Sequence, residues 1–119
     1  MNLPNVTPLP VNQINSTFAI APQMQAEHIA QIAGMGFKTV INSRPDFEAG
    51  PDQPTNASIQ AAAEQAGLTY VFIPIPPNTQ TEADIETMRQ VLAKVPTPIL
   101  GFCRSGNRVG RLYGLAMQK

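Results

Sequence analysis

The sequence contains no tryptophan, a single cysteine and a single histidine among its 119 residues. One cysteine excludes an intrachain disulfide and any metal site built from several thiolates, so neither metal nor cofactor is expected. No apolar run approaches the roughly 18 residues that a membrane-spanning helix needs, so no membrane partner is expected. The first ten residues lack the basic stretch and apolar core of a secretory signal, and the sequence therefore predicts a cytoplasmic protein.

Charge of either sign is also scarce, with eight basic and eight acidic residues that cancel to a net charge of zero. This balance argues against a general nucleic-acid-binding protein. The charges are unevenly placed, however, because Arg104, Arg108 and Arg111 fall within one short stretch beside the lone Cys103. The predicted partner is therefore a small anionic or phosphorylated substrate, and the sequence leaves the oligomeric state open.

Apolar periodicity predicts a chain in which helices and strands alternate. The expected helices are 23–33, 56–66, 81–94 and 109–118, and the expected strands are 38–42, 69–75 and 98–102, preceded by two short strands within 11–21. Such alternation predicts one α/β domain of three layers, with a mainly parallel central sheet of four to five strands and helices on both faces. Residues 1–10, which contain three prolines, are expected to form an irregular arm before a domain at 11–119.

Two polar loops follow predicted strands, at 42–48 and at 103–108. Ligands bind at the carboxyl ends of the strands in parallel sheets, so both loops are expected at one binding edge.

The loop 103–108 has the composition of an anion-binding site. Gly106 permits a tight turn, in which successive backbone N–H groups point inward, and the following helix adds its positive end. Arg108 can hold two oxygens of an oxyanion at once. The positive electrostatic field of the N–H groups, the helix end and the arginine is also expected to stabilise a thiolate at Cys103. The predicted anion-binding residues of the loop are Arg104, Ser105, Gly106, Asn107 and Arg108. The alternative is that Cys103 is a buried and unreactive core residue.

The runs Ile41–Glu48 (INSRPDFE) and Cys103–Arg108 (CRSGNR) together resemble the bacterial phosphatase-like domain that is also found fused to beta-lactamase-like hydrolases. The resemblance covers residues from about Val11 to the end of the sequence. It implies the fold of the dual-specificity, cysteine-dependent phosphatases. It also implies hydrolysis of a phosphate ester through a thiophosphate on Cys103, although some members are implicated in sulfur transfer.

The sequence departs from cysteine phosphatases at three positions. Phe102 stands where they have a histidine, and Val109 occupies the place of their arginine, six positions after Cys103. Gly110 replaces the serine or threonine that helps the thiolate to leave. The observed spacing to Arg108 instead resembles the active loop of rhodaneses, which carries a persulfide. A rhodanese-like sulfurtransferase with a Cys103 persulfide is therefore the alternative function.

A phosphatase also needs a proton donor for the leaving oxygen, and the loop 74–80 before the third predicted helix has no acid. Asp84 and Asp46 are the candidate donors. Thr81 and Asp84, however, also form a helix-capping pattern, and Asp46 equally suits a turn or salt bridge. Arg44 either adds positive field to the anion site or holds its own loop. A third hypothesis is a non-catalytic anion-binding module, and arsenate stays open as a substrate.

Overall fold

A five-stranded sheet in the order β1-β2-β5-β3-β4 forms the centre of the computed structural model, which describes residues 9–77 and 80–118. The strands are β1 (Asn12–Gln13), β2 (Phe18–Ala21), β3 (Thr39–Asn42), β4 (Thr69–Phe72) and β5 (Ile99–Phe102). All neighbouring pairs are parallel except β1 with β2. The prediction of a mainly parallel sheet is confirmed.

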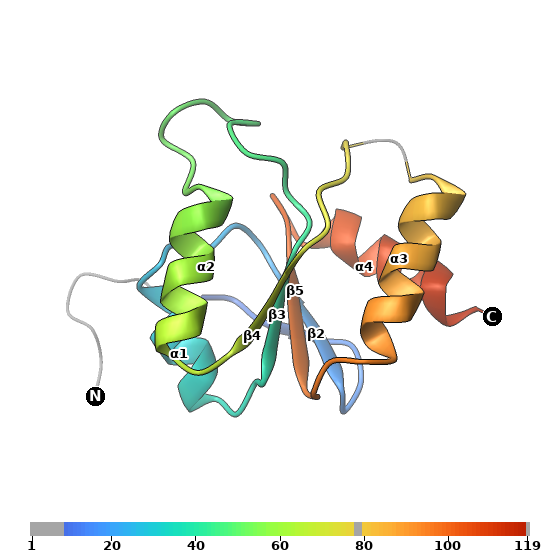
Figure 1. Ribbon diagram of the computed structural model, residues 1–119, viewed down its shortest axis with the longest axis horizontal. Coiled ribbons are helices and arrows are strands. Elements are labelled where there is room, and N and C mark those ends of the chain that lie inside the picture. Colours follow the sequence, from blue (N-terminus) through green and yellow to red (C-terminus); the bar gives the residue numbers. More distant parts are fainter. Residues whose placement is uncertain (1–8, 78–79, 119) are drawn as a thin grey trace.

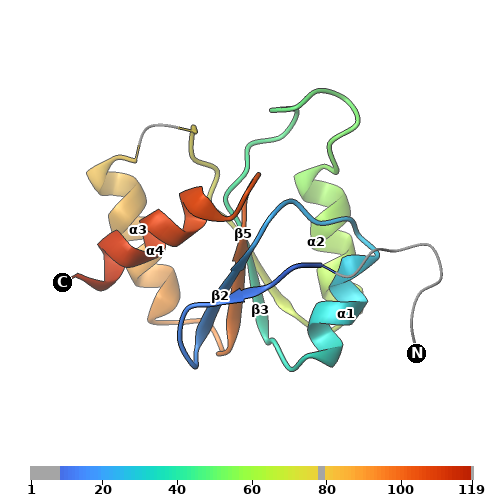
Figure 2. The same cartoon turned by 180° about the vertical axis from the view of Figure 1, so that it is seen from behind.

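Four helices cover the two faces of this sheet. They are α1 (His28–Gly34), α2 (Asn56–Gln65), α3 (Glu82–Leu92) and α4 (Asn107–Met117). Helices α1 and α2 lie on one side of the sheet and α3 and α4 on the other (Figures 1 and 2). The predicted three-layer α/β architecture is therefore confirmed.

Each face of the sheet has its own buried apolar cluster, because successive side chains of a strand point to opposite faces. Leu100 and Phe102 belong to the cluster under α1 and α2, whereas Ile99 and Cys103 belong to the cluster under α3 and α4. Gly101 lies between them, and a Cβ there would come within 2.8 Å of Val109 Cγ2. The missing side chain at this position therefore lets α4 pack directly against β5.

Four predicted element boundaries differ from the structure by two or more residues, one of them the end of α3, which lies at Leu92 rather than at residue 94. Helix α1 begins at His28 rather than at residue 23, because His28 Nδ1 accepts a hydrogen bond of 2.8 Å from Gln25 N–H and closes a turn first. Strand β4 ends at Phe72, before Pro74, which cannot donate to a sheet ladder. Helix α4 begins two residues earlier than predicted, because Gly106, with φ of 96°, turns the chain directly into it.

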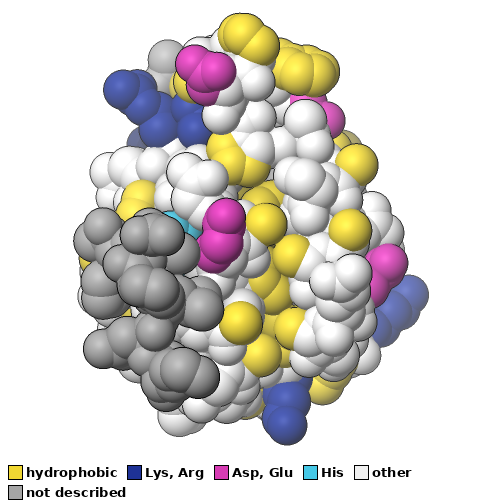
Figure 3. Space-filling model, turned by 90° about the vertical axis from the view of Figure 1, so that its left-hand side faces the viewer, with side chains coloured by type: hydrophobic (Ala, Val, Ile, Leu, Met, Phe, Trp, Pro, Cys, Tyr) yellow, Lys and Arg dark blue, Asp and Glu magenta, His cyan; other side chains and the backbone are white. Residues whose placement is uncertain are grey.

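Residues 1–8 of the predicted N-terminal arm, and residues 78–79 of the loop before α3, lie outside the described residues. Leu9 is buried, and its N–H donates to Gln31 Oε1 at 3.3 Å. Within the described ranges, no helix combines the length and the apolar character required to cross a bilayer. On the side of α1 and α2, hydrophobic side chains form a stripe and charged ones are scattered (Figure 3).

Candidate active site

The carboxyl ends of β3, β4 and β5 bring the two predicted loops together. Asn42 is aligned with both Phe72 and Phe102, so these three strands end at the same level. The sheet pairing continues for one more residue, because Ser43 N–H donates to Phe102 O at 2.9 Å and Ile75 N–H donates to Ser43 O at 3.1 Å. The loop that begins at Ser43 and the loop that begins at Cys103 are therefore held side by side, as the sequence predicted.

The sulfur of Cys103 lies on the inner side of the turn that its loop makes. Gly106 N–H donates to Cys103 Sγ at 3.2 Å, and Cys103 has no exposed surface. The positive φ of Gly106 favours glycine, and a Cβ there would stand 3.3 Å from Ala21 O. One backbone N–H of the loop, that of Gly106, therefore points at the sulfur, and the inward orientation of the other N–H groups stays a prediction. Burial in the cluster under α3 and α4 also fits the alternative of a core cysteine.

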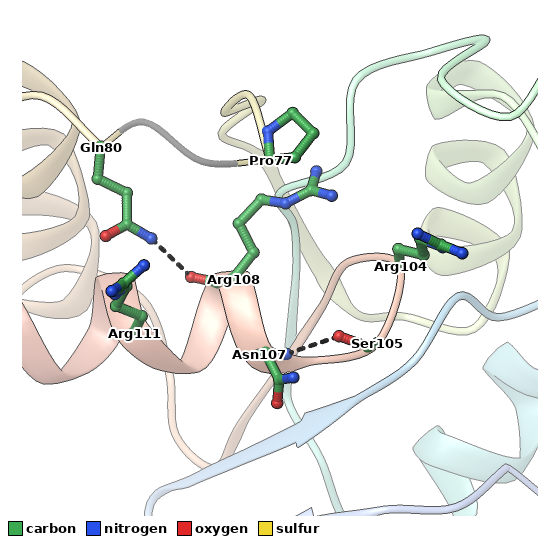
Figure 4. Close-up of a pocket in the computed structure, with 7 residues that line it drawn as sticks. All are labelled: Pro77, Gln80, Arg104, Ser105, Asn107, Arg108 and Arg111. Carbon is green, nitrogen blue, oxygen red and sulfur yellow. Dashed lines mark hydrogen bonds between the residues drawn. The ribbon is translucent and has the colours of Figure 1, made fainter.

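A basic pocket of about 520 Å³ opens at the loop and the start of α4 (Figure 4). It is lined by Pro77, Gln80, Arg104, Ser105, Asn107, Arg108 and Arg111. Four of the predicted anion-binding residues thus line one cavity, while Gly106 is buried. Ser105 Oγ accepts from Asn107 N–H at 3.3 Å, and Gln80 Nε2 donates to Arg108 O at 3.1 Å. These contacts place polar side chains along the wall of the pocket.

Glu48, to which sequence reasoning assigned no function, holds the guanidinium of Arg108. Arg108 Nη1 donates to Glu48 Oε2 at 2.9 Å and to Ile75 O at 3.2 Å, and Nη2 donates to Glu48 Oε1 at 3.1 Å. These bonds use three of the five N–H donors of a guanidinium. They leave Nε–H and one Nη2–H, which lie along the same edge of the group. That edge remains for an oxyanion.

Arg44 also binds Glu48 and does not line the pocket. Its Nε donates to Glu48 Oε1 at 2.9 Å, its Nη1 donates to Gln23 Oε1 at 3.1 Å, and its side chain is 7% exposed. Gln23 N–H in turn donates to Arg104 O at 3.1 Å. These contacts fit the interpretation that Arg44 holds its loop, and an anion-binding role for Arg44 stays a prediction. The one sequence signal for Glu48 was its position four residues after Arg44.

The electrostatic environment of Glu48 favours its ionised form. Burial by itself raises the pKa of this carboxyl group, but hydrogen bonds from Arg108 and Arg44, together with their charges, outweigh the burial and lower the pKa below its ordinary value. Glu48 is therefore an anion at neutral pH, which keeps both guanidinium groups in place.

The two candidate proton donors lie at helix N-termini. Asp46 Oδ1 accepts from Asn56 N–H at 2.6 Å, at the start of α2. Asp84 Oδ2 accepts from Thr81 N–H at 3.0 Å, and Thr81 Oγ1 accepts from Asp84 N–H at 3.1 Å, which confirms the predicted capping box of α3. Neither aspartate lines the pocket, and among its described lining residues there is no carboxylate. A donor role for either one stays a prediction.

Comparison with known proteins points to one family. Residues 11–119 match the family described as "Beta-lactamase hydrolase-like protein, phosphatase-like domain". Beta-lactamase hydrolase-like proteins of Xylella fastidiosa (strain Temecula1) and Agrobacterium fabrum (strain C58) are each 40% identical over 103 residues, which is 87% of this chain and 24% of each relative. The chain thus spans about a quarter of the length of these curated relatives.

Solved structures agree with this match. A protein of Neisseria meningitidis, crystallised as a candidate phosphatase, is 35% identical with a TM-score of 0.75, covering 87% of this chain and 72% of its own. TpbA of Pseudomonas aeruginosa is 20% identical with a TM-score of 0.66, covering 91% and 64%. The catalytic domain of the PP-IP phosphatase Siw14 of Saccharomyces cerevisiae is 15% identical with a TM-score of 0.69, covering 92% and 66%. The last two likenesses concern the fold alone.

Proposed function

Because this chain belongs to the family of phosphatase-like domains of beta-lactamase hydrolase-like proteins, we propose that it hydrolyses a phosphate ester through a thiophosphate on Cys103. The observation that carries the proposal is the hydrogen bond from Gly106 N–H to Cys103 Sγ, in a loop of which Arg104, Ser105, Asn107 and Arg108 line a basic pocket. A backbone N–H aimed at sulfur stabilises the thiolate, which is the nucleophilic form.

In the proposed reaction, the phosphoryl group binds to the backbone N–H groups of residues 104–108 and to the remaining edge of Arg108. The Cys103 thiolate attacks phosphorus, the S–P bond forms, and the leaving oxygen departs with the electron pair of the broken P–O bond. Water then cleaves the S–P bond and releases phosphate. Cys103 has no exposed surface, so the side chains that cover the sulfur must move when substrate enters.

Sulfur transfer through a Cys103 persulfide is the second candidate, and a specific observation favours it. No carboxylate is found among the described residues that line the pocket, and the sulfite that leaves thiosulfate needs no proton donor. The four residues between Cys103 and Arg108 also close a smaller ring of N–H groups than a phosphatase loop does. Such a ring suits a sulfane sulfur.

Intact-protein mass spectrometry separates these functions. The protein is incubated with an aryl phosphate and, separately, with thiosulfate, and the Cys103→Ser variant is the control. Retention of one phosphoryl group that is absent from Cys103→Ser supports the phosphatase. Gain of one sulfur atom, again dependent on Cys103, supports the sulfurtransferase. Absence of both adducts, with neither substrate turned over, overturns both proposals.

A further inference from the structure

The pocket holds more positive charge than Arg108 alone provides. Arg108 is neutralised in part by Glu48, whereas Arg104 and Arg111 are exposed and form no ion pair with any carboxylate of the described residues. Figure 4 shows Arg104 and Arg111 on opposite sides of Arg108. Arg111 follows Arg108 by three positions in α4, which places both on one face of the helix. A second cation therefore stands beside the loop, next to Gln80.

The wall near Arg111 suits a charged group better than an aromatic ring. Of the seven residues that line the pocket, only Pro77 is apolar. A phenyl leaving group would find no aromatic side chain, and only the ring of Pro77, to pack against among the described lining residues. The volume of about 520 Å³ leaves room for more than one tetrahedral anion, since a water molecule occupies about 30 Å³ in the liquid.

We infer that the substrate of this site is a diphosphate, in which the terminal phosphoryl group occupies the loop 103–108 and the second phosphate binds Arg111. This inference rests on the proposed Cys103 chemistry and adds a substrate class to it. The second phosphate lies where the pocket continues along α4 past Arg108, and the Arg111 guanidinium supplies the hydrogen-bond donors for its oxygens.

The lack of a lining carboxylate agrees with this substrate class. The Cys103 thiolate attacks the terminal phosphorus, the S–P bond forms, and the bridging P–O bond breaks with its electron pair passing to the departing phosphate. That group is stable as an anion and needs no proton, whereas the alkoxide of a serine-type ester needs one. Water then delivers its oxygen to the thiophosphate, the thiolate is restored, and the remaining proton passes to the solvent.

Calorimetric binding to the Cys103→Ser protein tests the subsite without turnover. Inorganic phosphate probes the loop alone, and inorganic pyrophosphate probes the loop together with the second subsite. We expect pyrophosphate to bind more tightly than phosphate. Adding Arg111→Ala should then lower the ratio of the pyrophosphate affinity to the phosphate affinity by about fivefold, which is the effect of losing one exposed charge pair. Adding Lys94→Ala removes the same charge from an exposed site outside the pocket, and should leave the ratio unchanged.

Three results would overturn the inference. They are equal affinity for the two anions, an equal effect of Arg111→Ala and Lys94→Ala on the ratio, and failure of both anions to bind at millimolar concentration. Circular dichroism of each variant confirms that it is folded. If the ratio falls as expected but no thiophosphate forms on the Cys103 protein, the diphosphate subsite stands and the proposed hydrolysis fails. Failure of the diphosphate subsite and failure of the proposed hydrolysis are therefore distinguished by different measurements.

Discussion

The carboxylate of Glu48 meets the guanidinium of Arg108 through two hydrogen bonds of 2.9 and 3.1 Å, although the residues lie 60 positions apart in the sequence. Both side chains are largely buried, with 17% of Glu48 and 8% of Arg108 exposed. This contact fixes which edge of Arg108 faces a substrate, and it joins the loop after β3 to the start of α4.

Replacing Glu48 by glutamine should therefore destabilise the protein strongly. The variant leaves the buried guanidinium groups of Arg108 and Arg44 without a counter-ion, which we expect to cost about 3 kcal/mol in the free energy of unfolding. Urea denaturation measures this change. The matched control is Glu86→Gln, whose ion pair with Arg89 is 51% and 31% exposed and should cost less than about 1 kcal/mol. Equal losses in the two variants would contradict the structural role of Glu48.

The lowered pKa of Glu48 predicts an acid-dependent stability. A carboxyl group whose pKa is lower in the folded state stabilises the protein fully above its ordinary pKa of 4.5, and this stabilisation is lost as the pH falls through the folded-state value. The difference in unfolding free energy between the natural protein and Glu48→Gln should therefore narrow below about pH 4.5. Urea denaturation of both proteins from pH 7 to pH 3 measures it. A constant difference across this range would contradict the prediction.

Exchanging Arg108 for lysine should abolish most aryl phosphate turnover while keeping the charge. An ammonium group cannot hold Glu48 with two parallel hydrogen bonds and present a second planar edge to an oxyanion. We expect a loss of about 10²–10³-fold in turnover, as for removal of a transition-state donor. Lys94→Arg, a conservative exchange at an exposed site, is the control. Turnover within a few-fold of that of the natural protein would show that the planar guanidinium group of Arg108 is not needed.

The sequence predicts features that depend on residues close together in the chain better than contacts between residues far apart in it. Apolar periodicity and turn residues are local, so the alternation of helices and strands and the capping box at Thr81 could be predicted. The Glu48–Arg108 pair could not, because nothing local in either segment identifies its partner. The burial of Cys103 depends on α3 and α4 packing over the end of β5, which strand patterns alone do not specify.

The two aspartates provide a test of the missing proton donor. Their carboxylates accept backbone N–H groups near the starts of α2 and α3, so Asp46→Asn and Asp84→Asn should each lower stability by only about 0.3–1 kcal/mol. We expect both variants to retain aryl phosphate and thiosulfate turnover. A loss of aryl phosphate turnover by roughly 10²–10⁴-fold in one variant would instead identify that aspartate as the general acid.

Ser43 should be replaceable by alanine with a gain in stability. Its Oγ is the one buried side-chain polar atom without a hydrogen-bond partner in residues 9–77 and 80–118. Removing it should stabilise the protein by about 1 kcal/mol, because an unsatisfied buried hydroxyl carries a desolvation cost. Thr39→Val is the matched control, since Thr39 Oγ1 donates to Pro96 O at 2.7 Å and its loss should destabilise by about 1 kcal/mol. Urea midpoints that shift in the same direction would contradict this account.

The contacts of Gln23 have a mechanical consequence. Hydrogen bonds run from Arg108 to Glu48, from Arg44 to Glu48, from Arg44 to Gln23, and from Gln23 N–H back to Arg104 O. The backbone from 104 to 108 completes this path, and the contacts together form a closed ring. Because the ring of contacts is closed, none of its parts moves alone. Opening of the Cys103 loop therefore also displaces the segments that follow β2 and β3. Any motion that uncovers the sulfur is therefore concerted across three parts of the chain.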